Sequence, residues 1–300
     1  MRAYSTANPG LVLAGAYTLL AFFGSWACWG ASAALLAAGG ASGAFVGRVL
    51  LVAGTLVPLF ATYALFPRLR AAGFVGVTAA PEDAEAESSP RDGFWRFAFG
   101  GGTNRRAVAV FAAFAVWRWV ACRLGFGFPE TPLDALGSFF GNLPLLLLGG
   151  GLEEVGWRGC LQPCLESGLA TLSGSRKWGG DPEGRPLPRR RIAVMLAPVV
   201  CGLVWGFWHL PLAAIPGTLQ SQVPFWGILV VGVSLSCSFA ALRRVCGTVR
   251  SCILSHAWYN AMLVSIPAFS PAAVALFAVE AVFGLLGSLF MAEGRSRGRD

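Results

Sequence analysis

The sequence predicts an all-α fold, a polytopic membrane bundle of about eight transmembrane helices. First, apolar residues make up 55% of the 300 residues, glycine contributes another 39, and the mean hydropathy is +0.62. Second, charged residues are only 13%, roughly half the usual share of a soluble domain. Third, apolar stretches long enough to cross a bilayer recur along the chain, with arginines in the short segments between them. This composition excludes a disordered chain and a water-soluble domain of ordinary surface.

Each membrane-crossing helix needs roughly 20 apolar residues, because the hydrocarbon core is about 30 Å thick. Eight stretches meet or approach that length: 11–37, 45–66, 107–123, 138–166, 192–212, 224–242, 249–266 and 271–290. The third contains Arg118, and the fourth is interrupted by Pro144 and by glycines at 149–151, so the ends of these two are the least defined. The first stretch exceeds the 7–15 apolar residues typical of a signal peptide, and we expect a retained helix.

The distribution of basic residues supports this count of helices. Of the 23 basic residues, 19 lie in the N-terminal tail and in alternate loops, at 67–106, 167–191, 243–250 and 291–300. The intervening loops, at 38–44, 124–137, 213–223 and 267–270, contain none. Because cytoplasmic loops are enriched in Lys and Arg, we expect a multi-pass protein of the cell membrane with both termini in the cytoplasm. The net charge of +8 therefore reflects topology, and no nucleic-acid partner is expected.

The chain divides into two parts at about residue 135. Residues 1–135 hold the first three helices and a cytoplasmic loop near 67–106, which is expected to be flexible because 78–92 is rich in Ala, Pro and acidic residues. Residues 136–300 hold the motifs described below. Their loop at 167–191 is rich in Gly, Pro and Arg, is also expected to be flexible, and is basic enough to lie against anionic lipid. The eight cysteines have no metal-binding spacing and are interpreted as small packing residues.

Ionisable side chains inside the predicted helices are the best candidates for function, because each costs about 2.5–3.5 kcal/mol at a helix centre on insertion scales. Two of them lie outside the motifs. Arg118, between two tryptophans, is expected to stack on indole or reach a lipid phosphate. Glu280 is expected to find a polar partner within the bundle, and neither is proposed as a site residue. The others are Glu153, Glu154, Arg158, His209 and His256.

The first motif is GLEEVGWRG at 151–159. Glu154 and Arg158 are four residues apart, so on a helix they share a face and can form an ion pair. Glu153 points about 100° away and has no such neighbour, which suits a general base in a dry site. The alternative is a helix end at which both carboxylates are simply hydrated.

The second motif is WGFWHLP at 205–211. Trp205 and His209 are four residues apart, so the indole can flank the imidazole, and Pro211 loosens the helix beside them because it cannot donate to the carbonyl of Phe207. A single histidine of this kind is more often a hydrogen-bonded structural residue than a ligand.

The third motif is SHAWYN at 255–260, in which His256 and Asn260 share a helix face. Imidazole and carboxamide together can hold a water, a metal or a substrate carbonyl. A hydrogen-bonded pair between helices is an equally good interpretation of this motif alone.

Taken in order, the pattern EExxxR, aromatic-xxx-His and HxxxN on separate helices resembles the CPBP family of CAAX prenyl proteases and bacteriocin-processing or abortive-infection (Abi) proteins. The resemblance covers about 150–265. It departs from the family at Trp205, where phenylalanine is common, and in the long basic segment 167–191. The residues that carry the resemblance are Glu153, Glu154, Arg158, Trp205, His209, His256 and Asn260.

The resemblance implies an intramembrane endopeptidase. Glu153 would activate a water with help from His209, while His256 and Asn260 would polarise the carbonyl or stabilise the oxyanion. The Glu154–Arg158 pair would fix the helix face that carries Glu153. Whether a metal takes part stays open: Glu153, His209 and His256 form an acceptable zinc set, with Glu154 then the candidate base, and a metal-free glutamate mechanism is the alternative.

The expected partners are the lipid bilayer and a peptide or protein substrate that enters from the membrane or the cytoplasmic side. Two other classes stay open. One is a non-catalytic membrane protein that binds a bacteriocin, a lipid-linked peptide or a protein partner, as an immunity or abortive-infection protein would. The other is a transporter with a proton relay through Glu153, His209 and His256, which the lack of a repeated half disfavours.

Overall fold

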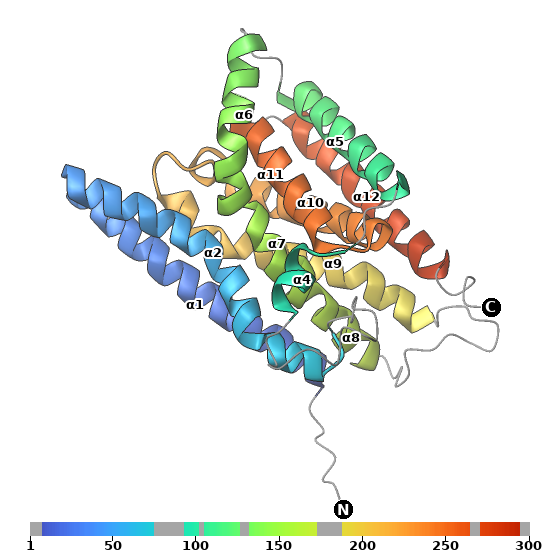
Figure 1. Ribbon diagram of the computed structural model, residues 1–300. Helices are drawn as coiled ribbons and strands as arrows, with labels where there is room; N and C mark the ends of the chain where they lie inside the picture. The colour runs from blue at the N-terminus through green and yellow to red at the C-terminus, as the bar shows by residue number, and fades with distance from the viewer. Residues whose placement is uncertain are drawn as a thin grey trace, which may run out of the picture.

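The computed structural model describes residues 8–74, 93–101, 105–126, 132–172, 188–264 and 271–294. Every regular element in these ranges is a helix, as predicted (Figure 1). The predicted flexible segments 78–92 and 173–191 fall mostly outside the described residues.

The helices follow the predicted spans closely. The long ones are α1 (Pro9–Ala38), α2 (Ala41–Ala71), α5 (Arg105–Phe126), α6 (Pro132–Gly149), α9 (Pro188–Trp208), α10 (Phe225–Cys246), α11 (Val249–Val264) and α12 (Pro271–Gly294). Between α6 and α9 the chain forms a 3₁₀ turn η1 (Gly151–Glu153), α7 (Glu154–Gly156), a π-helical turn η2 (Trp157–Leu161) and α8 (Gln162–Leu172). Two 3₁₀ turns, η3 (Leu210–Ala214) and η4 (Gln220–Gln222), connect α9 to α10.

The first two helices form an antiparallel hairpin along one side of the bundle (Figure 1). Gly39 and Gly40 make its turn with φ of 76° and 82°, which only glycine adopts freely. Gly54 lets the two helices approach closely, because a Cβ there would lie 2.3 Å from Nε1 of Trp29. Small residues at such crossings are typical of membrane helix pairs, in which packing replaces the hydrophobic effect.

The remaining helices surround the segment from α6 to α8. α6 packs against α11, and α8 packs against α1 and α9. α10 lies between α9 and α12, and α5 covers α10, α11 and α12. The segment that carries the first motif is therefore enclosed by helices from both parts of the chain.

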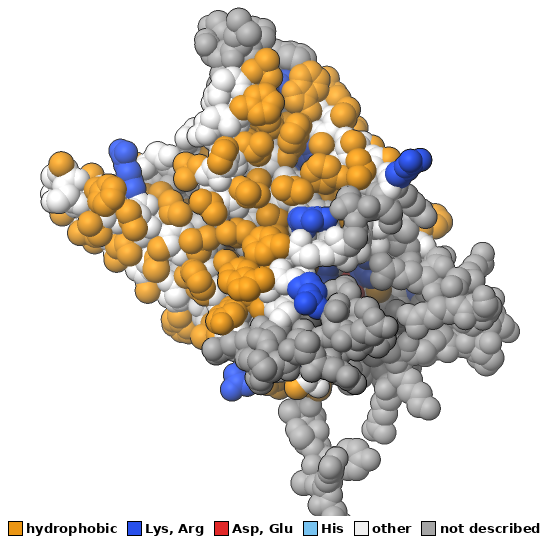
Figure 2. Space-filling model, viewed as in Figure 1, with side chains coloured by type: hydrophobic (Ala, Val, Ile, Leu, Met, Phe, Trp, Pro, Cys, Tyr) orange, Lys and Arg blue, Asp and Glu red, His pale blue; other side chains and the backbone are white. Residues whose placement is uncertain are grey.

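The lipid-facing character of the surface agrees with a multi-pass membrane protein. Figure 2 shows hydrophobic side chains spread over most of the described surface on that face. Large apolar side chains on α1, α2, α5, α6 and α12 are exposed, among them Phe23, Phe45, Val116, Phe140 and Phe283. In a soluble protein so much exposed apolar area would mark an aggregation hazard, whereas in a bilayer it is the favourable outer surface.

Four of the described helices are long and apolar enough to cross a membrane by themselves: Pro9–Ala38, Ala41–Ala71, Arg191–Ala214 and Phe225–Cys246. Two more, Val108–Val120 and Ala275–Phe290, are apolar but shorter. The other two predicted spans are a 16-residue helix, α11, and the stretch 138–166, which the turns η1 and η2 divide. The structure thus supports a polytopic bundle, while the number of eight crossings stays a prediction.

One helix was not predicted from the sequence. α4 (Phe94–Phe99) lies within the loop 67–106 that was expected to be flexible, and its Phe94 and Ala98 are buried. Phe94 packs edge-on against Tyr63 and Phe66 of α2. Aromatic contacts therefore hold this end of the loop against the bundle.

Candidate active site

The helix that carries the first motif changes its winding where the two glutamates lie. α6 ends at Gly149, one 3₁₀ turn holds Glu153, and a π-helical turn begins at Trp157. Pro144 and the three glycines explain the break, because neither residue type favours a continuous helix. Such local unwinding is frequent at functional sites and presents consecutive side chains in different directions.

Glu154 faces away from the cavity described below and contacts two basic side chains. Its Oε2 accepts a hydrogen bond from Nε of Arg158 at 2.8 Å, and both side chains are completely buried. The predicted i,i+4 pair is therefore present. Its other oxygen, Oε1, lies 3.0 Å from Nδ1 of His256, a contact that the sequence did not predict because the two residues are a hundred positions apart.

Glu153 faces the second motif. Its Oε2 accepts a hydrogen bond from Nε1 of Trp205 at 3.0 Å, and the side chain is buried. Among the described residues no Lys or Arg forms an ion pair with it, in contrast to its neighbour Glu154. The expected difference between the two carboxylates is thus present, although the partner of Glu153 is an indole.

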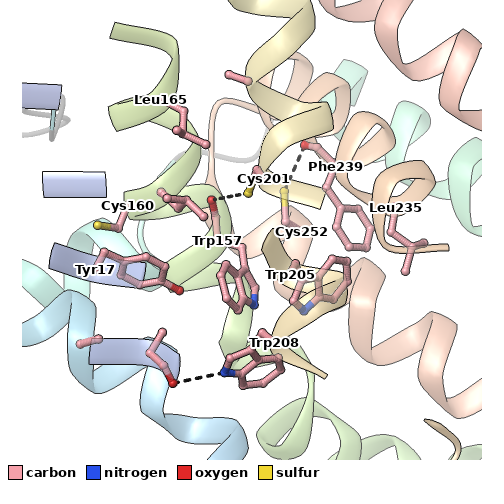
Figure 3. Close-up of a cluster of buried hydrophobic side chains, with 14 of the residues drawn as sticks. Tyr17, Trp157, Cys160, Leu165, Cys201, Trp205, Trp208, Leu235, Phe239 and Cys252 are labelled. Carbon is pink, nitrogen blue, oxygen red and sulfur yellow. Dashed lines mark hydrogen bonds between the residues drawn. The ribbon is translucent and has the colours of Figure 1, made fainter. Parts of the chain in front are cut away.

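Trp205 is the side chain that the other motif residues share. Its ring centroid lies 5.6 Å from that of His209 and 5.1 Å from that of His256. The guanidinium of Arg158 lies over the same ring at 5.5 Å. Figure 3 shows Trp205 within a cluster of buried rings that includes Trp157, Trp208 and Phe239. The sequence anticipated only the contact with His209.

His209 lies immediately after α9 ends. The helix stops at Trp208 because Pro211 cannot continue it, and the chain turns into η3. Nδ1 of His209 lies 2.9 Å from the carbonyl oxygen of Trp205. Since a carbonyl only accepts, Nδ1 carries the proton, and Nε2 of a neutral ring is left as an acceptor.

A single cavity of about 350 Å³ brings the motif residues together. Glu153, Trp205, His209, His256 and Asn260 all line it. The carboxamide of Asn260 makes no hydrogen bond within the described part of the chain and faces this space. Acid, imidazole and carboxamide groups from three separate helical segments therefore converge on one volume large enough for a small part of a peptide.

Position 150 must be glycine for this arrangement, which was not predicted from the sequence. A Cβ at this position would lie 2.3 Å from Nδ2 of Asn260 and 3.5 Å from Nε2 of His256. Only glycine leaves the third motif in its present place. The run of three glycines before the glutamates was a visible signal, but which side chains approach it depends on the packing of separate helices.

The comparison with protein families agrees with this geometry. Residues 135–262 match the family described as type II CAAX prenyl endopeptidase Rce1-like. We refer to residues 135–262 as the Rce1-like segment. It extends from α6 through most of α11 and contains every residue of the three motifs, whereas α1, α2, α5 and α12 lie outside it. No curated protein matches the chain.

The match of this segment confirms the resemblance drawn from the motifs, and the matched family suggests a protease of the CAAX-type intramembrane endopeptidase class. The roles of individual residues do not follow from the match and are taken up below.

A series of polar contacts runs from Glu154 along the Rce1-like segment to Arg244, and we call it the ladder. Nη1 of Arg158 lies 3.4 Å from Oε1 of Gln162, and Nε2 of Gln162 donates to Oε1 of Glu166 at 2.9 Å. Glu166 forms an ion pair with Arg244 of α10. The side chains spaced four residues apart from Glu154 to Glu166 are thus linked, and only Glu166 and Arg244 are partly exposed. This spacing was visible in the sequence, but the prediction stopped at Arg158.

The environment predicted for Arg118 was wrong. Arg118 is buried and forms an ion pair with Glu280, which joins α5 to α12. Its guanidinium lies over the rings of Phe114, Phe239 and Tyr259. A lipid phosphate cannot reach it there, and the aromatic partners come from three helices instead of from its indole neighbours. Glu280 has the polar partner that was expected for it.

The described residues do not form a metal site in this arrangement. No three His, Cys, Asp or Glu side chains among them are grouped so that they could hold a metal ion. Nδ1 of His209 is engaged by a backbone carbonyl, Nδ1 of His256 by Glu154, and one oxygen of Glu153 by Trp205. These contacts leave Nε2 of both histidines unused, and the participation of a metal at Glu153, His209 and His256 stays a prediction.

Proposed function

We propose that the protein is an intramembrane endopeptidase that hydrolyses a peptide bond with a water activated by Glu153. The observation that carries the proposal is the convergence of Glu153, His209, His256 and Asn260 on one cavity around Trp205. The Rce1-like match supports the reaction class.

In this proposal Glu153 takes a proton from the bound water as the water oxygen attacks the scissile carbonyl carbon. His209 accepts a hydrogen bond from the same water through Nε2 and orients it. Glu153 then returns the proton to the leaving nitrogen as the C–N bond breaks, so that the products are a carboxyl group and an amine. A carboxylate held by one indole N–H keeps an oxygen available for this exchange.

The oxyanion of the tetrahedral intermediate would lie against Asn260 and His256. The amide of Asn260 is a free donor, and Nε2 of His256 lies near it across Gly150. To donate from Nε2 while Nδ1 faces Glu154, the imidazole of His256 must carry protons on both nitrogens. The carboxylate of Glu154, 3.0 Å away, is the counter-ion for that state. Preorganised donors of this kind are often the largest contribution to catalysis.

Glu154 is accordingly a positioning residue, because both of its oxygens are engaged. Arg158 holds Glu154, and Trp205 holds Glu153. We propose the metal-free route, because no three His, Cys, Asp or Glu side chains among the described residues are grouped so that they could hold a metal ion. Full activity of protein from which metals have been stripped supports this route, and activity that returns only when zinc is added back contradicts it.

The substrate is proposed to be a membrane-associated or membrane-delivered peptide. The experiment that tests the function compares the membrane peptides of cells that express the wild-type chain with those of cells that express Glu153→Gln. Glutamine keeps the acceptor for Trp205 but cannot take a proton, so a peptide cleaved only by the wild type is expected. If the two sets are identical while the variant changes no folding property, the chain is better explained as a non-catalytic binding protein.

A further inference from the structure

The active-site cavity reaches the surface at one end of the bundle. It begins at Glu153, which is buried, and extends to the turns between α9 and α10, where Thr218, Gln220 and Gln222 line it. Gln222 is exposed, so this segment forms a mouth. We refer to residues 218–223 as the mouth segment.

The mouth segment lies at the end of the bundle opposite to the basic loops. α9 has 21 residues and is about 30 Å long, which is the thickness of the hydrocarbon core. It begins beside the arginines at 189–191, so its other end, at Trp208, reaches the opposite side of the membrane. Figure 1 shows the connection from α9 to α10 far from both chain termini. Because basic loops are cytoplasmic, the mouth faces the non-cytoplasmic side.

The helices that line the cavity agree with this placement. Its lining from α10 comes from the first half of that helix, between Ile228 and Leu235, and its lining from α11 comes from the middle to the end of that helix, between His256 and Leu263. Both are the helix halves that adjoin the mouth. The half of the bundle toward the basic loops is filled by the ladder, in which Glu154, Arg158 and Gln162 are buried. A path from the cytoplasm would have to cross these paired side chains.

The mouth segment is ordered by Thr218. Its hydroxyl donates to the carbonyl oxygens of Leu212 and Ile215, and it accepts from the backbone N–H of Ser221. Ser221 and Gln222 in turn donate to the carbonyl oxygen of Thr218. The side-chain amide of Gln220 makes no hydrogen bond within the described residues and lines the cavity. A free amide at the mouth is suited to bind the backbone of an extended peptide.

The cavity wall carries little charge. Of the described residues that line it, Glu153 is the only one with a carboxylate, none is Lys or Arg, and most are apolar. Away from Glu153 and His256, a charged substrate side chain would lose its hydration there without gaining a charged partner. The chemistry of the wall therefore selects uncharged residues next to the scissile bond.

From these observations we infer that the cavity admits its substrate from the non-cytoplasmic side, through the mouth segment, and takes an uncharged peptide stretch whose backbone Gln220 binds. This inference rests on the proposed function for the cleavage itself, and it replaces the cytoplasmic route that the sequence left open.

The side of the mouth can be measured without any activity. Intact cells that express Gln222→Cys or Leu172→Cys are treated with a membrane-impermeant maleimide, and the wild type reports background labelling of native cysteines. Leu172 is the matched control, because it is exposed at the other end of the bundle, at the end of α8. We expect label on Gln222→Cys alone in intact cells and on Leu172→Cys alone in inverted membrane vesicles. The reverse pattern overturns the inference and leaves the proposed hydrolysis untouched.

Use of the mouth is tested by blocking it. The impermeant maleimide is applied to intact cells that express Gln220→Cys, and cleavage of the peptide identified with Glu153→Gln is followed. We expect cleavage by Gln220→Cys to be lost after labelling relative to the same cells left untreated, and cleavage by the wild type to be unchanged after the same treatment. Cleavage that persists in fully labelled Gln220→Cys, or cleavage sites flanked by charged residues, contradicts the inference. If no cleaved peptide exists but the labelling pattern holds, the proposed function has failed and the orientation stands.

Discussion

The consecutive residues Glu153 and Glu154 separate two polar regions of different character. Glu154 heads the ladder, in which each side chain from Arg158 to Arg244 contacts the next. Glu153 borders the cavity, where the amides of Asn260 and Gln220 make no hydrogen bond to the described residues. One region has its polar groups linked to each other, and the other leaves donors free.

The difference shows how stability and chemistry are divided in this bundle. A buried charge that is paired and hydrogen-bonded holds helices together but has nothing left for a substrate. Arg118 and Glu280 form a second buried ion pair, outside the Rce1-like segment. Free donors in a buried cavity cost folding free energy and are retained only where a ligand uses them. The cavity side is therefore where we expect chemistry, and the ladder side is where we expect stability.

The largest expected effect comes from breaking the ladder at its buried ion pair. Arg158→Met leaves the carboxylate of Glu154 buried without its cation, and the free energy of unfolding should fall by about 3 kcal/mol. That is the lower end of the range for a buried pair, because His256 still faces Glu154. Unfolding in detergent, followed by tryptophan fluorescence, measures the loss.

Two variants sharpen this contrast between the regions. Glu153→Gln should leave the free energy of unfolding unchanged, because the amide oxygen still accepts from Trp205. Combining Glu154→Leu with Arg158→Met removes both charges and should cost less than Arg158→Met alone. If the double variant is less stable than Arg158→Met, the Glu154–Arg158 ion pair contributes more to the free energy of unfolding than an unpaired Glu154 carboxylate costs.

The next effect concerns the cavity side. Gly150→Ala would place a Cβ 2.3 Å from Nδ2 of Asn260, and the carboxamide must move. Misplacement of a catalytic group by about 1 Å can cost roughly 10²-fold, so we expect kcat to fall by about that factor with little change in stability. Gly141→Ala in the preceding helix α6 is the control, since a Cβ there meets nothing within 4 Å. Equal activity of the two variants would remove Asn260 from the proposed oxyanion site.

The contacts around Glu154 and Gly150 also show what the sequence could and could not predict. Spacing within one helix is available from the sequence, so the Glu154–Arg158 pair and the flanking of His209 by Trp205 were predicted and found. Contacts between helices depend on crossing geometry, which spacing does not determine. The approach of His256 to Glu154 and the need for glycine at 150 were therefore missed.

The span boundaries followed from apolar length, because the bilayer imposes the same requirement on every helix. The helix α4 was not anticipated for the opposite reason: six residues are too few for a periodic signal, and aromatic contacts with Tyr63 and Phe66 hold it in place. Arg118 was assigned to its sequence neighbours, whereas helix packing brings it to Glu280 and to rings from other helices.

A smaller effect is expected where the two regions meet, at Trp205. Trp205→Phe removes the N–H that holds Glu153 but keeps a ring beside both histidines. A hydrogen bond to a charged group is worth about 1.5–3 kcal/mol, and we expect kcat to fall about tenfold, at the lower end, with KM unchanged. Trp208→Phe is the matched control, because its N–H donates to the carbonyl oxygen of Ala21 and the variant keeps a ring beside His209. If both variants lower kcat equally, the indole of Trp205 acts through packing alone.

The smallest effect is expected at Gln162, in the middle of the ladder. Gln162→Leu removes both of its contacts at nearly constant volume, yet Arg158 retains Ser236 and Glu166 retains Arg244. Since no charge is left alone, the free energy of unfolding should fall by only about 1 kcal/mol, measured against Gln222→Leu at the exposed mouth. Because Glu154 still faces His256, kcat should not change. A fall in kcat without a fall in stability would mean that the ladder positions His256 over its whole length, and the division between a stabilising and a reactive region would not hold.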